Sequence, residues 1–205
     1  MLTKEYTILE PFTRTLWQPL TFKQVKKLSL NKSDNYVHTA LKEFVKSGIL
    51  EEKKVGNSIL YSISNNCFAL ETIGYIAEHK SQTSKHLPHK NIQKIMDKIK
   101  TAFYSLIITG SYSNKTYKKT SDMDIVIICD NNHDTNAILS EIKMESELMT
   151  PEVHPYVFTQ AQLFEMLTNK EENYGKEFVK NNLIITGGKQ FYSIVMEAMN
   201  NGFNG

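Results

Sequence analysis

The chain has 205 residues, of which 40% are hydrophobic and 22% charged, as is usual for a globular protein. No apolar run reaches the roughly 18 residues of a transmembrane helix, so we expect no membrane partner. The N-terminus lacks the apolar core of a signal peptide. The two cysteines, Cys67 and Cys129, are far apart, which excludes a disulfide framework and favours a reducing cytoplasm.

Charge is unevenly distributed along the chain. Residues 1–100 hold 16 Lys and Arg against 9 Asp and Glu, a net +7. Residues 101–205 hold 8 against 13, a net −5. A basic half joined to an acidic half predicts two modules with different partners.

The basic half has the order helix, short turn, helix, hairpin. Apolar residues recur at helical spacing after Thr21, a plausible N-cap, and again between residues 35 and 48, where Gly48 would end the second helix. The strand-like runs ILEEKK and ILYSIS then flank a Gly56-Asn57 turn. This order resembles the winged helix-turn-helix family, and we assign residues 1–80 to such a domain.

The winged-helix resemblance implies double-stranded DNA as a partner. In that family the second helix enters the major groove and the hairpin lies beside phosphates. The implied contacts are Lys32, Ser33, Asn35, Tyr36, Thr39 and Lys42 on the helix, with Lys53 and Lys54 on the hairpin. A homodimer is expected if the operator is two-fold. A winged helix used for dimerisation or protein contact is the alternative.

Residues 81–89 are polar, contain Pro88 and are interpreted as a linker to a second domain at 90–205. His86 and His89 have a spacing that can bind metal, but no carboxylate or cysteine cluster accompanies them.

The second domain opens with two apolar runs around a polar loop. The first run ends at Gly110-Ser111, and the second starts with Asp122 and Asp124. Alternation along a strand puts both carboxylates on one face, roughly 6.6–6.8 Å apart. Two neighbouring carboxylates repel each other, so a divalent cation is their natural partner.

Gly-Ser, nine residues, then Ser-Asp-x-Asp resembles the signature of DNA polymerase beta-like nucleotidyltransferases, particularly the minimal branch. The resemblance implies a mixed β-sheet with flanking helices, which makes the whole chain α+β. It also implies that Gly110, Ser111 and Ser121 help bind a nucleoside triphosphate (NTP), and that Asp122 and Asp124 are catalytic ligands of Mg²⁺ or Mn²⁺.

The sequence departs from the family pattern at two points. The loop has Ser113, Asn114 and Lys115 where the family often has Ala-Arg-Gly, so the cationic role would pass to Lys115, or to Lys118 or Lys119. The family usually adds a third carboxylate from a later strand. In the segment PEVHPYVFT we expect Glu152 to fill this catalytic position. One alternative is that His154 acts as a base or ligand, and the other is that neither residue does.

These features predict a Mg²⁺-dependent nucleotidyltransferase that acts on RNA, a protein or a small-molecule hydroxyl. Its DNA-binding domain would make it similar to toxin–antitoxin components that control their own operon. The alternative is a cytoplasmic transcriptional regulator whose nucleotidyltransferase-like domain senses a nucleotide without turnover.

Overall fold

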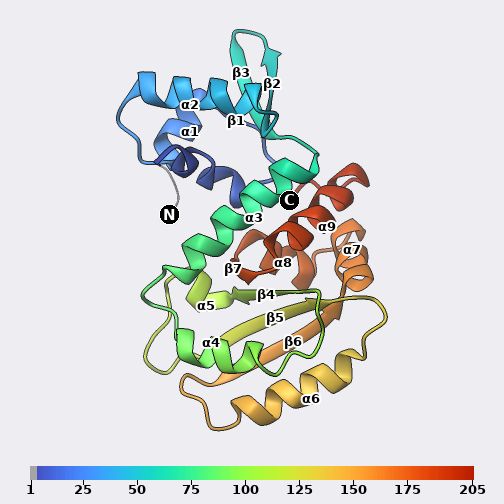
Figure 1. Cartoon of the computed structure of the whole chain (residues 1–205). Coiled ribbons are helices and arrows are strands. Elements are labelled where there is room, and N and C mark those ends of the chain that lie inside the picture. The colour runs from blue at the N-terminus through green and yellow to red at the C-terminus, as the bar shows by residue number, and fades with distance from the viewer. Residues whose placement is uncertain (1–3) are drawn as a thin grey trace.

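The computed structural model describes residues 4–205 and confirms the predicted α+β class. The N-terminal part forms one small unit, drawn at the top of Figure 1. Its elements are η1 (Lys4–Ile8), η2 (Glu10–Thr13), β1 (Leu20–Thr21), α1 (Phe22–Leu28), α2 (Asp34–Lys46), β2 (Leu50–Val55) and β3 (Ser58–Ile63). The strands form an antiparallel sheet in the order β1-β3-β2.

Capping and turn residues mark where these elements begin and end. Thr21 and Gln24 form a capping box at the start of α1, and the Ser33 hydroxyl accepts the Tyr36 N–H at the start of α2. Gly48 follows α2 with φ +74°, the left-handed conformation that ends many helices. Gly56 turns the β2–β3 hairpin, whose tip projects away from the rest of the molecule (Figure 1).

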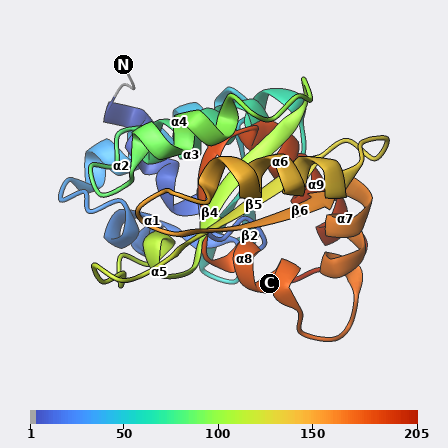
Figure 2. The ribbon, with the colours of Figure 1, turned by 90° about the horizontal axis from the view of Figure 1, so that it is seen from below.

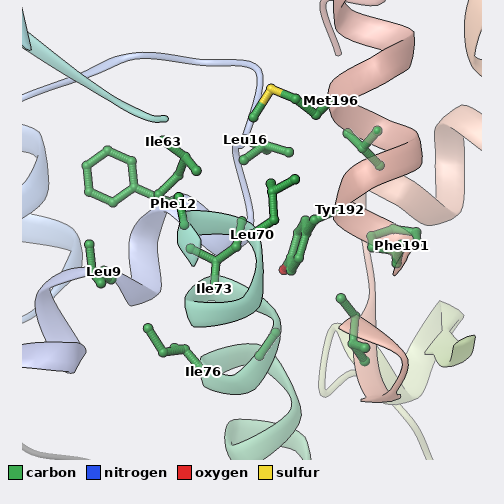
Figure 3. Close-up of a cluster of buried hydrophobic side chains, with 14 of the residues drawn as sticks. Leu9, Phe12, Leu16, Ile63, Leu70, Ile73, Ile76, Phe191, Tyr192 and Met196 are labelled. Carbon is green, nitrogen blue, oxygen red and sulfur yellow. The ribbon is translucent and has the colours of Figure 1, made fainter. Parts of the chain in front are cut away.

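One long helix joins the two halves. α3 (Cys67–Gln82) packs against η2 on one side and against α9 (Gly188–Asn200) on the other. Ile73 of α3 lies in a buried cluster with Phe12 and Leu16 from the N-terminal unit and Tyr192 from α9 (Figure 3). The two halves therefore share a core across α3, and α3 extends past residue 80, the predicted end of the first domain. The division into 1–80, 81–89 and 90–205 stays a prediction.

The second half is built around a four-stranded sheet in the order β6-β5-β4-β7. β4 pairs antiparallel with β5 and β7, and β6 pairs parallel with β5, so the sheet is mixed, as predicted. The elements are α4 (His89–Met96), β4 (Tyr104–Thr109), α5 (Gly110–Ser113), β5 (Met123–Cys129), α6 (Thr135–Ser146), β6 (Val153–Thr159), α7 (Gln160–Thr168), α8 (Tyr174–Lys180), β7 (Leu183–Thr186) and α9.

Helices cover both faces of this sheet. α4 and α6 cover one face of the sheet (Figure 2). Ile108 and Ile125 are fully buried on this face. The other face carries Ile107 and Val126 in the shared core, which α3, α7, α8 and α9 complete. Residues of β5 therefore alternate between two cores, and Asp124 falls on the side of Val126 and α8.

α4 ends at Met96, and Ile99 and Thr101 are buried in the run that leads into β4. The buried face of α3 starts at Ala69 and Leu70, so Phe68 is 59% exposed. In the described range, no helix has the length and apolar character needed to cross a membrane.

Candidate active site

The antiparallel pairing of β4 and β5 brings the Gly-Ser turn to the acid pair. Thr109, the last residue of β4, lies opposite Asp124 in the register. Gly110 follows with φ +67°, and a Cβ placed on it would overlap the Oδ2 atom of Asp124. Another residue here would be strained in its backbone and would have to displace the Asp124 carboxylate, so glycine suits both features.

The parallel pairing of β5 and β6 adds a histidine to the two aspartates. Asp124 lies beside His154 in the register. His154 Nδ1 is 2.8 Å from Asp122 Oδ2 and 4.0 Å from Asp124 Oδ1. The structure thus brings Asp122, Asp124 and His154 together, and a histidine, in place of a third carboxylate, lies beside the two aspartates.

Glu152 lies at the rim of this group. It precedes β6, its side chain is 79% exposed, and its Oε1 is 3.4 Å from His154 Nε2. Its backbone carbonyl accepts the Met123 N–H at 2.8 Å, which joins the start of β6 to β5. The Glu152 carboxylate therefore contacts the far side of the imidazole ring rather than the aspartates.

Negative charge accumulates around Asp124. Burial raises the pKa of Asp124, and the nearby charges of Asp122 and Glu177 raise it further, while His154 lowers it. A divalent cation would neutralise this excess charge.

Two members of this neighbourhood were missed from the sequence. Glu177 and Tyr174 belong to α8, and the Asp124 charge raises the pKa of Tyr174 after the larger effect of burial. Only the packing of α8 on the sheet brings them to β5. No signal near either residue in the sequence indicates it.

The polar loop after β4 is held by its own contacts. The Ser113 hydroxyl donates to the carbonyls of Gly110 and Asn181, which fixes α5 against the end of α8. Ser121 accepts the Lys118 N–H and so closes a turn just before Asp122. Lys115 is exposed in a left-handed conformation with φ +58°. Ser111, at the first turn of α5, is half-buried.

An aromatic stack anchors the same loop to the segment after α3. Tyr117 stacks on Tyr112 with ring centroids 4.5 Å apart and on His86 at 5.8 Å. His86 Nε2 is 3.1 Å from the Tyr112 carbonyl, and His89 Nε2 is 2.8 Å from the Ser84 carbonyl. One ring nitrogen of each histidine therefore contacts a backbone carbonyl.

Residues 89–185, from the start of α4 to β7, match the nucleotidyltransferase domain family. This part of the chain is a nucleotidyltransferase domain. The match contains Gly110, Ser111, Asp122, Asp124 and His154. Neither the curated proteins nor the solved structures contain a match to the chain. The helices and the three-stranded sheet of the N-terminal unit lie outside the matched range.

The acid pair of the nucleotidyltransferase domain fits a Mg²⁺ ion only in part. Among residues 4–205, no group of three or more His, Cys, Asp or Glu side chains is arranged to hold a metal. Asp122 and Asp124 offer two carboxylates that both lie within 4.0 Å of His154 Nδ1, and carboxylates supply the hard oxygen ligands that Mg²⁺ prefers. Because Mg²⁺ keeps waters and binds substrate phosphates, two protein ligands suffice if a triphosphate supplies others.

The residues expected to contact DNA lie outside the nucleotidyltransferase domain, and most are exposed: Lys32, Asn35, Thr39, Lys42, Lys53 and Lys54. Ser33 caps α2, and the Tyr36 ring is partly buried against the core. Lys53 and Lys54 are adjacent in β2 and so point to opposite faces of the hairpin.

Proposed function

We propose that the protein transfers a nucleoside monophosphate from an NTP to a hydroxyl acceptor in a Mg²⁺-dependent reaction. The observation that carries this proposal is the Gly110–Asp124 contact: a left-handed glycine turn lies directly against one of two paired carboxylates within a nucleotidyltransferase domain. This arrangement joins a backbone able to approach phosphates to a pair of metal-binding oxygens.

The bonds exchanged in this reaction define the residue roles. The acceptor oxygen bonds to the α-phosphorus, the bond from that phosphorus to the bridging oxygen breaks, and pyrophosphate leaves. Asp122 and Asp124 would hold Mg²⁺, which neutralises the charge developing on the phosphates. Gly110 and Ser111, with Ser121 and Lys115 on the following loop, would bind the triphosphate.

His154 and Glu152 would handle the acceptor's proton. If His154 donates from Nδ1 to Asp122, its Nε2 is left free to accept a proton on the side of Glu152. Glu152 would then stabilise the charged ring, which gives it a supporting role in catalysis in place of a third metal ligand.

The test is to follow the label from NTPs carrying it at the α- or the γ-phosphate, with RNA, protein and small-molecule acceptors and Mg²⁺. We expect α-label, and no γ-label, to appear in one acceptor class, and Asp122→Ala and Asp124→Ala to abolish it. Equal labelling by the two variants, or transfer of γ-label, would contradict nucleotidyl transfer.

A second candidate function is a DNA-binding regulator that senses a nucleotide without turnover. The histidine in place of a third carboxylate favours it, as does the N-terminal order of two helices and a hairpin with exposed lysines. This function would use the N-terminal unit as a winged helix bound to double-stranded DNA, and a homodimer is expected if the operator is two-fold. NTP binding that changes DNA affinity without α-label transfer would identify it. A transferase that also controls its own operon would show both activities.

A further inference from the structure

Two tyrosine rings lie together on the side of the acid pair away from Gly110. β5 carries Asp124 and lies between β4, which leads into Gly110, and β6. Tyr156 follows His154 by two residues on β6 and so shares its face. Its ring centroid is 4.8 Å from that of Tyr174, at the start of α8. Tyr156 is 38% exposed, so part of this aromatic pair remains open to a ligand.

The Tyr174 hydroxyl has an unused capacity for hydrogen bonding. It is buried and has no hydrogen-bond partner among the described residues. Buried polar groups nearly always have a partner, so an unpartnered hydroxyl beside a candidate active site suggests a ligand. A tyrosine hydroxyl carries its proton near neutral pH and can donate to such a ligand.

Charge decides which part of an NTP fits beside this pair. Asp124 and Glu177 are both close enough to act on Tyr174, so this side of the site carries negative charge. Mg²⁺ would neutralise Asp124 when the triphosphate binds, but the Glu177 carboxylate remains on the α8 side and disfavours a further phosphate there, whereas the nucleoside is the uncharged part of the NTP. A triphosphate at Gly110 and an α-phosphate at Asp124 leave the β6 side to the nucleoside, because β5 lies between β4 and β6.

We propose that Tyr156 and Tyr174 form the nucleoside subsite, in which the Tyr156 ring stacks on the base and the Tyr174 hydroxyl donates to the base or the ribose. This inference rests on the proposed binding of NTP at Asp122 and Asp124. Aromatic rings stack on every base, so the pair supplies affinity for all four NTPs, with modest preference among them.

The test compares Mg²⁺-dependent binding of each NTP with that of inorganic triphosphate, measured calorimetrically on the full chain. In the wild type, NTP should bind more tightly than triphosphate, because only NTP reaches the tyrosines. Tyr156→Ala should weaken NTP binding about tenfold, the effect of losing one base–aromatic stack, and leave triphosphate binding unchanged. Tyr174→Phe keeps the ring and should weaken NTP binding about fivefold, the effect of one lost hydrogen bond.

Tyr75→Ala is the matched control, because Tyr75 is an exposed tyrosine on α3 in contact with His79. An unchanged ratio of NTP to triphosphate affinity in both test variants would overturn the nucleoside subsite. Unchanged NTP affinity with lost transfer would overturn it too, and would place the pair on the acceptor side. Absence of both NTP and triphosphate binding in the wild type would contradict the proposed function itself and this inference with it.

Discussion

Gly110 lies so close to the Asp124 carboxylate that a Cβ on it would overlap the Oδ2 atom unless the carboxylate moved. The contact arises because β4 and β5 are antiparallel and Thr109 lies opposite Asp124, so the chain must turn at the next residue. The turn proposed to bind phosphate and the carboxylate proposed to bind metal are thereby fixed to each other by sheet hydrogen bonds, independently of the exposed loop between them.

Gly110→Ala should damage the site more than the fold. The added Cβ would displace the Asp124 carboxylate, and the left-handed backbone would add a cost of about 1–2 kcal/mol. We expect Mg²⁺-dependent NTP binding to be lost, measured calorimetrically, with a modest fall in melting temperature.

Gly56→Ala is the matched control for this change. Gly56 has a similar φ of +59°, but a Cβ there meets nothing within 4 Å. It should show a similar fall in stability with unchanged NTP binding. Normal binding in Gly110→Ala would mean that the contact with Asp124 does not position a ligand-binding group.

His154→Asp should strengthen metal binding. The substitution places a carboxylate beside Asp124 in the β5–β6 register, where His154 now contacts Asp122. With a third oxygen ligand, the Mg²⁺ concentration for half-maximal NTP binding should fall by about tenfold.

The companion variant Glu152→Gln separates the two candidates for the third position. Glu152 is largely exposed, so its loss should change the Mg²⁺ requirement by less than about twofold. If Glu152→Gln raised the Mg²⁺ concentration for half-maximal NTP binding by a larger factor than His154→Asp lowered it, Glu152 would instead be the third metal ligand.

Glu78 makes the joint between α3 and α9 sensitive to pH. Its carboxylate accepts the Gly188 N–H at 2.6 Å at the start of α9, and burial raises its pKa above the usual value. Because the folded state then binds the proton more tightly than the unfolded state, this residue's contribution to stability falls as pH rises.

We therefore expect the free energy of unfolding of the wild type to fall relative to Glu78→Gln between about pH 4 and the raised pKa of Glu78. Denaturant titrations of both proteins at several pH values measure this difference. A difference that stays constant from acidic to neutral pH would show that Glu78 is not perturbed in the folded protein.

DNA binding by the N-terminal unit would depend on its exposed lysines. Lys42→Glu with Lys53→Glu should weaken binding to duplex DNA, and the slope of log affinity against log salt should fall by about 0.9 for each lost phosphate contact. Fluorescence anisotropy over a salt series measures both quantities.

Lys90→Glu with Lys94→Glu on α4 changes the same number of charges at a distance from α2 and the hairpin, and serves as the control. If both pairs weaken DNA binding equally, the interaction reflects overall charge and not a recognition surface.

The sequence was sufficient to predict those parts of the candidate site that depend on a single pair of neighbouring strands. Strand alternation and a glycine turn predict that Asp122, Asp124 and Gly110 lie near one another, and in the structure Gly110 lies against Asp124 while His154 contacts Asp122. The choice between Glu152 and His154 depended on where β6 begins, and element boundaries are hard to place from sequence.

Residues that reach the site through long-range packing could not be predicted. Tyr174 and Glu177 come from α8, about 50 residues after Asp124, and the packing of that helix on the sheet depends on distant core residues such as Phe178 and Val126. The core shared by the two halves could not be predicted for the same reason. The sequence of α3 alone has the pattern of an ordinary amphipathic helix between two domains.

The most direct test of the metal–triphosphate site is calorimetric binding of a non-hydrolysable NTP to the full chain, with Mg²⁺ and with EDTA. Wild-type protein should bind tightly only with Mg²⁺, and the double variant Asp122→Asn with Asp124→Asn should lose this dependence. Binding by the wild type that is equal with and without Mg²⁺, and equal in the double variant, would contradict the assignment of these carboxylates to the metal.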